Sequence, residues 1–125
     1  MAKQTLILGS QRAELLKNWR NGVILAELDE KHDPRPVLKL FNPCGAQTWL
    51  LTEIVDGDDE DTILFGLCDL GFGTPELGYV SLAELKSVRF MGGALGIERD
   101  IHFCATKTLA EYTAEARRLG RIEVC

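Results

Sequence analysis

Residues 36–54 read PVLKLFNPCGAQTWLLTEI, and this stretch decides the fold. Its two apolar runs, residues 36–41 and 48–54, have the length and residue types of β-strands. Asn42 and Gly45 between the runs belong to the residue types that tight chain reversals favour. The stretch therefore predicts an antiparallel hairpin.

Further strands are expected on the C-terminal side of this hairpin. Residues 62–70 form a third apolar run after an acidic turn, and the short connection makes the meander antiparallel. All three runs are apolar on both faces, as expected when helices cover one side and another layer or a partner covers the other. Residues 78–80 form a short extended piece. Alternating apolar residues over 97–104 predict a fourth long strand with one wet face.

Three helices are expected around these strands. The first follows Ser10 as a possible N-cap, runs for about 11 residues and ends before Gly22. The other two begin at S/T-x-x-E capping boxes: Ser81–Glu84 before a helix over 82–89, and Thr108–Glu111 before a helix that stops at Gly120. The pattern predicts one α+β domain over residues 1–125, an antiparallel sheet of four to five strands with the two longer helices packed on one face.

Composition excludes several classes of function. The chain has 125 residues and a net charge of −5, whereas contact with nucleic-acid phosphates needs a basic face. Only three consecutive apolar residues, 6–8, follow the N-terminus, too few for an export signal or a membrane span. No two of the four cysteines have C-x-x-C spacing. We expect a cytoplasmic protein with four unpaired thiols, no membrane contact and no direct nucleic-acid contact.

Motifs for cofactors, metals and nucleophiles are weak. GFGTPE, residues 71–76, begins like a dinucleotide fingerprint but has Glu76 at its third glycine position. His102 and Cys104 lie two apart, without two further ligands at metal-binding spacing. His32 lies in a charged connection and is expected to be solvated, and Cys68 is a small core residue. We expect no cofactor and no metal.

The most interesting candidates are carboxylates around the glycine-rich loop. Asp69 ends the third strand, Glu76 lies in the loop, and Tyr79 follows it, so chain connectivity brings all three to one edge of the sheet. Paired carboxylates could hold Mg²⁺ or perform acid–base chemistry. They could equally accept hydrogen bonds from loop amides, and this structural role is favoured for Glu76.

A second candidate is the acidic turn at residues 56–61. A solvated turn explains it, and the alternative is an electrostatic contact for a basic partner. Its acidic residues are Asp56, Asp58, Asp59, Glu60 and Asp61.

Four strings carry a resemblance to a known family. They are KLF (39–41) with TWLLTE (48–53), FGLCDLG (65–71), PELGYVSLAEL (75–85), and ERD with HF (98–103). Together they resemble domain-of-unknown-function family 2958 over about residues 15–122, and the run 65–85 is the most specific part. The resemblance implies a small bacterial protein of plasmids and integrative conjugative elements, at times beside antirestriction or DNA-processing proteins. It implies no activity and no catalytic residues.

These observations give two expectations for function. The first is a non-enzymatic accessory module of mobile elements that binds another protein through apolar and acidic surfaces. The alternative is a small metal-assisted hydrolase or nuclease accessory built on Asp69 and Glu76. Whether these two carboxylates converge in a water-accessible pocket distinguishes the two.

Overall fold

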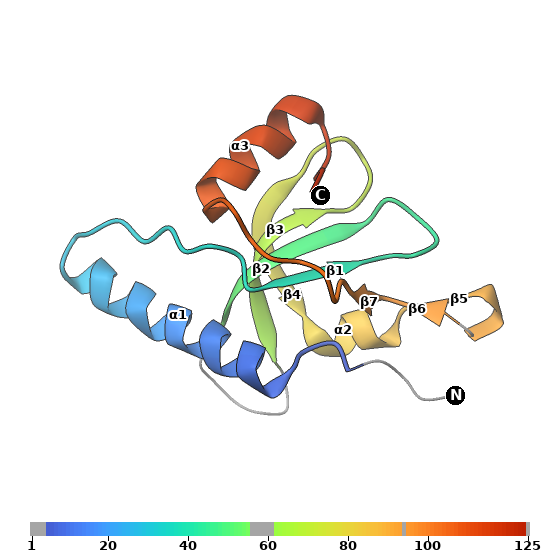
Figure 1. Cartoon of the computed structure of the whole chain (residues 1–125), viewed down its shortest axis with the longest axis horizontal. Coiled ribbons are helices and arrows are strands. Elements are labelled where there is room, and N and C mark those ends of the chain that lie inside the picture. The colour runs from blue at the N-terminus through green and yellow to red at the C-terminus, as the bar shows by residue number, and fades with distance from the viewer. Residues whose placement is uncertain (1–4, 56–61, 94, 125) are drawn as a thin grey trace.

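A five-stranded antiparallel sheet forms the centre of the computed structural model, which describes residues 5–55, 62–93 and 95–124 (Figure 1). The strand order is β4-β3-β2-β1-β7. Its strands are β1 (Leu38–Phe41), β2 (Thr48–Ile54), β3 (Ile63–Asp69), β4 (Glu76–Ser81) and β7 (Glu98–Arg99). A separate hairpin pairs β5 (Arg89–Phe90) with β6 (Leu95–Gly96), around the short 3₁₀ helix η1 (Met91–Gly93). The helices are α1 (Gly9–Glu27), α2 (Leu82–Ser87) and α3 (Leu109–Leu119).

The α+β class and the antiparallel sheet are confirmed, but the two longer helices cover opposite faces. Leu51 of β2 packs in one core cluster with Leu15 of α1. Its neighbour Leu50 packs in a second cluster with Leu109 of α3. Successive side chains of a strand point to opposite faces, so α1 and α3 lie on either side of the sheet (Figure 1). The expectation of a single helical face was wrong because both faces of β2 and β3 are apolar and each recruits a helix.

The predicted hairpin is present with the expected chemistry. Leu38 of β1 lies opposite Leu51 of β2, and Phe41 lies opposite Thr48. Asn42 closes the turn. Its backbone N–H donates to Gln47 O (2.9 Å), and its side-chain Oδ1 accepts the backbone N–H of Cys44 (2.8 Å). This side chain takes the place of a backbone acceptor, which is why Asn suits the position.

Helix α1 is longer than its sequence predicts. It starts at Gly9, where Gln11 Oε1 accepts the amide of Leu8 (2.9 Å), so Ser10 is not the N-cap. It then continues through Gly22 to Glu27. Gly22 lies inside the helix at a close approach: an added Cβ would be 2.8 Å from His32 Cδ2 in the connection after α1 and 3.4 Å from Glu53 Oε1 of β2. A glycine that permits close packing is tolerated inside a helix.

The predicted fourth strand over 97–104 is wrong. Only Glu98–Arg99 pairs with β1, and the chain then turns at Asp100. The Asp100 side chain accepts the amide of His102 (2.9 Å), and its carbonyl accepts the amide of Phe103 (3.3 Å). Local hydrogen bonds of this kind compete with strand pairing.

Both predicted capped helices are present. Ser81 Oγ accepts the amide of Glu84 (3.3 Å) at the start of α2, which ends at Ser87. At α3 the capping box is complete, because Thr108 and Glu111 each accept the other's amide. Gly120 ends α3 in the left-handed region, at φ 78°. None of the helices in the described part of the chain is both long enough and apolar enough to cross a membrane.

Candidate functional site

Asp69 at the end of β3 is a buried structural anchor. Its Oδ1 accepts the amide of Gly71 in the following loop (2.9 Å), and its Oδ2 accepts the amide of Ile122 beyond α3 (2.9 Å). Only 2% of the residue is exposed. Asp69 therefore ties the β3–β4 loop to the segment after α3, the role that sequence reasoning favoured for Glu76.

Glu76 lies on the other face of the sheet. It opens β4 and pairs with Cys68, so it shares a face with Cys68, whereas Asp69 points to the opposite face. Its side chain is exposed. The two carboxylates that a shared cation would need are thus separated by the sheet. Within the described ranges, no three His, Cys, Asp or Glu side chains are grouped as a metal site would require.

Strand β4 is longer than expected and forms an edge of the sheet. The amide of Leu82 donates to Thr62 O (2.9 Å), so residues 62 and 82 form a hydrogen-bonded pair. Such pairs alternate along an antiparallel ladder, so Gly78 exchanges hydrogen bonds with Gly66. The amides of Leu77 and Tyr79, in the pairs between, do not bond β3. The main-chain amides of Leu77 and Tyr79 therefore point outward. Residues described in the structure give these two amides no hydrogen-bond partner.

Exposed apolar side chains surround this edge. We name the set of Leu70, Phe72, Leu77 and Tyr79 the β4 apolar patch. Phe72 is 83% exposed and Tyr79 is 65% exposed. The Tyr79 ring packs on Phe65 with centroids 5.0 Å apart, which holds it at the edge. All four members line one hollow of about 220 Å³ at this edge. Leu77 and Tyr79 share the α3 face with Leu67 and Phe65, so the patch wraps around the edge strand instead of lying on one face.

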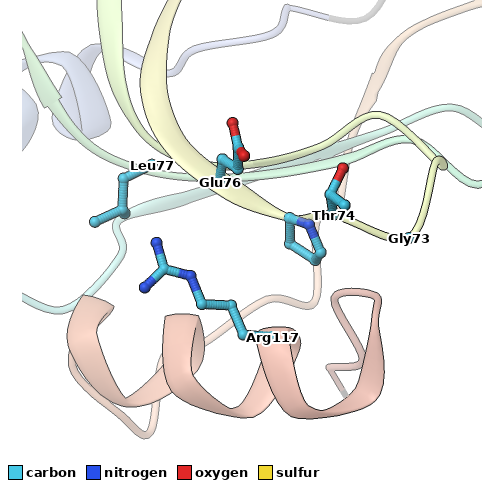
Figure 2. Close-up of a pocket in the computed structure, with 6 residues that line it drawn as sticks. Gly73, Thr74, Glu76, Leu77 and Arg117 are labelled. Carbon is cyan, nitrogen blue, oxygen red and sulfur yellow. The ribbon is translucent and has the colours of Figure 1, made fainter.

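A second hollow lies on the α3 side of the same strand. It has a volume of about 400 Å³, and its walls are residues 73–77 and Arg117 of α3 (Figure 2). Figure 2 shows the Arg117 side chain reaching from α3 toward Leu77, while the Glu76 carboxylate points away from it. Among the described side chains, none forms an ion pair with Arg117. One strand thus separates a hollow that Arg117 lines from a hollow that Leu70, Phe72 and Tyr79 line, and Glu76 belongs to the lining of both.

Sequence reasoning missed a buried polar cluster under α1. His32 is not solvated: its Nε2 is buried, lies 3.5 Å from Glu53 Oε1, and has no hydrogen-bond partner within the described part of the chain. Glu53 Oε2 accepts the hydroxyl of Thr52 (3.1 Å), and Asn18 of α1 donates to Thr52 O (2.9 Å). Neither hollow described above includes these residues. The cluster therefore fastens the connection after α1 to β2, and a glutamate inside an apolar strand was the one signal that could have revealed it.

The remaining candidates do not converge. His102 and Cys104 are both exposed in the turn after β7. Cys44, Cys68 and Cys104 are unpaired. Burial raises the pKa of the Cys68 thiol to about 11, opposite to the shift that activates a nucleophilic cysteine. The acidic turn at 56–61 lies outside the described residues.

Comparison with known proteins places the chain without giving it an activity. Searches against curated proteins and against solved structures found no match. The family of proteins of unknown function DUF2958 matches residues 6–123, nearly the whole chain, including both strands and the loop that form the β4 edge. The chain belongs to family DUF2958.

Proposed function

We propose that this protein is a non-enzymatic binding module that docks another protein against the edge of its sheet at β4. The observation that carries the proposal is the β4 apolar patch. Contiguous apolar surface of this kind on a small protein marks sites of protein contact more often than isolated exposed residues do. An edge strand with outward amides adds a second means of attachment.

The enzyme alternative has less support. A metal-assisted hydrolase needs carboxylates that converge on one cation, and the sheet separates Asp69 from Glu76. Both carboxylate oxygens of Asp69 also accept backbone amides, so the group has a structural role already. Glu76 lines both hollows, and the residues that line them with it include no second carboxylate and no histidine. A binding surface explains these features more simply.

We further propose a setting for this binding: an accessory protein of a plasmid or integrative conjugative element, beside antirestriction or DNA-processing proteins. The resemblance described above supports this setting. The acidic residues between 56 and 61 are proposed as a second contact on sequence grounds alone.

Affinity capture from cells that carry the chain's own genetic neighbourhood tests the binding proposal. Wild-type protein is compared with Phe72→Ser and Tyr79→Ser, which remove apolar area from the β4 apolar patch. The matched control is Ile101→Ser, which removes an equally exposed apolar side chain (66%) from a distant turn.

We expect a protein that is retained by the wild type and by Ile101→Ser but lost with the two patch variants. Because Phe72 is 83% exposed, its loss should leave the unfolding midpoint nearly unchanged, whereas Tyr79→Ser should lower the midpoint slightly because the ring packs on Phe65. A partner retained equally by all four proteins would contradict the proposed surface.

A further inference from the structure

The outward amides of β4 restrict what can dock there, and this inference rests on the proposed function. An added strand would hydrogen-bond to Leu77 and Tyr79, whose N–H groups point away from β3. Side chains of the added strand would then alternate between the two faces of the sheet. The surroundings of β4 on each face therefore specify alternate side chains of the partner.

On the α3 face, β4 presents a cation. Arg117 reaches toward Leu77 from the last turn of α3 and lines the hollow of about 400 Å³ (Figure 2). It has no ion-pair partner in the ranges that the structure describes. A guanidinium matches a carboxylate in a two-pronged geometry. A side chain that lies opposite Leu77 on this face is therefore best complemented when it is acidic.

On the other face, β4 presents an apolar recess. A Cβ built on Gly78 would meet no atom within 4 Å, so the space above this residue is open. Cys68, Leu70 and Phe72 line the hollow of about 220 Å³ beside it, and the exposed Glu76, two residues before Gly78 on the same face, lines it as well. A side chain opposite Gly78 would be desolvated against these groups, which favours a bulky apolar residue.

We propose that β4 binds an extended segment of another protein by strand addition, with an acidic side chain beside Arg117 and an adjacent apolar side chain over Gly78. The two partner residues are neighbours in sequence because Leu77 and Gly78 are neighbours. The recognised feature is thus an acidic residue followed or preceded by an apolar residue within a β-strand. The charge of Arg117 selects the acidic residue, and the missing side chain of Gly78 leaves room for the apolar one.

Selection from a random peptide library displayed on phage tests the preference. Three baits are used: wild type, Arg117→Glu and Arg118→Glu. Arg118 is the matched control, because it is exposed in the same last turn of α3 but lines neither hollow. The two charge reversals disturb the helix dipole alike.

We expect wild type and Arg118→Glu to enrich peptides with an acidic–apolar pair. The same peptides should bind Arg117→Glu about tenfold more weakly, the loss typical of a charged hydrogen bond, and that variant should select basic residues instead. Peptides that bind all three baits equally would overturn the role of Arg117 while leaving the binding module intact.

Amide hydrogen exchange locates the bound peptide. In the uncomplexed protein the amides of Leu77 and Tyr79 should exchange fast, and that of Gly78 slowly, because it bonds β3. Selected peptides should slow the first two. Binding without this protection would overturn strand addition, and protection without peptide that rises with protein concentration would make a second copy the occupant. A library without any enriched peptide would also overturn the inference, while the capture experiment decides the proposed function separately.

Discussion

Gly22 shows how one missing side chain sets the packing of α1. The space above its Cα holds His32, whose Cδ2 would lie 2.8 Å from an added Cβ, and Glu53 Oε1 would lie 3.4 Å away. Alanine is favoured over glycine by about 1 kcal/mol inside a helix. The close approach of the connection after α1 therefore opposes the intrinsic preference of the helix.

A double-mutant cycle measures this opposition. Gly22→Ala should stabilise the His32→Ala protein by about 0.5–1 kcal/mol, through helix propensity alone. In the wild type the same change should destabilise, because the added methyl displaces the imidazole from Glu53. Denaturant unfolding of the four proteins gives the coupling between the two positions. Equal effects of Gly22→Ala in both backgrounds would mean that His32 does not pack on the helix.

The two carboxylates near the β3–β4 loop should differ sharply in their effect on stability. In Asp69→Asn an NH₂ group replaces one of the two oxygens that accept backbone amides, so one amide loses its acceptor. We expect the free energy of unfolding to fall by about 1–3 kcal/mol. Glu76→Gln, at an exposed position, should change stability by less than about 0.5 kcal/mol. Thermal or denaturant unfolding checks both. Mg²⁺ should leave both midpoints where they are, and a rise in wild-type Tm that Glu76→Gln abolishes would restore the metal alternative.

At the scale of elements, short-range signals predicted the structure well and long-range ones did not. The hairpin at Asn42 and the capping box at Thr108 were predicted because each depends on residues a few positions apart. The extension of α1 past Gly22 and the placement of helices on both faces were not predicted, because they depend on contacts between distant segments. The strand predicted over residues 97–104 does not form, because Asp100 accepts the amides of His102 and Phe103 locally, through its side chain and its carbonyl.

The β2–β3 pairing depends on another glycine. A Cβ on Gly66 would lie 2.1 Å from Leu50 O and 2.8 Å from Leu51 Cα, at the register shift between the strands. Both contacts are with backbone, which cannot rotate away. We expect Gly66→Ala to cost about 3 kcal/mol or more. Gly78→Ala is the matched control in the opposite strand, with open space around it, and should be neutral. Similar unfolding midpoints for both variants would show that the strands do not approach this closely.

At the scale of the whole molecule, the two faces of one sheet contribute to two separate hydrophobic cores. This arrangement limited what the sequence could predict about function. Chain connectivity predicted that Asp69, Glu76 and Tyr79 lie at one edge of the sheet, and the structure places Glu76 and Tyr79 on the edge strand β4 and Asp69 at the end of the neighbouring β3. It could not predict that alternate faces separate the two carboxylates, since the strand register was unknown. The place of Arg117 beside β4 could not be predicted either, because it depends on how α3 docks on the sheet.

The rates at which the cysteine thiols react should follow the exposure of each cysteine. Cys44 and Cys104 are exposed and should react quickly with a thiol reagent near neutral pH. Cys68 should react at least about tenfold more slowly, because its raised pKa leaves little thiolate. Two variants assign each kinetic phase to a cysteine. Cys68→Ser should remove the slow phase, and Cys125→Ser identifies the phase of the thiol that lies outside the described residues. In denaturant without reductant four thiols should be counted, and a lower count would contradict a fully reduced protein.

The hydrogen bond from Ile122 to Asp69 has a consequence for how the protein is handled. It joins two residues that are 53 positions apart in the sequence. It also holds the segment after α3 near Gly73, which lines the Arg117 hollow: a Cβ on Gly120 would lie 3.6 Å from Gly73 O. Shortening the chain before residue 122 would remove a donor from a buried carboxylate and also release one side of that hollow. A C-terminal deletion would thus weaken peptide recognition without touching a recognition residue, so labels and surface attachments for binding work belong at the other terminus.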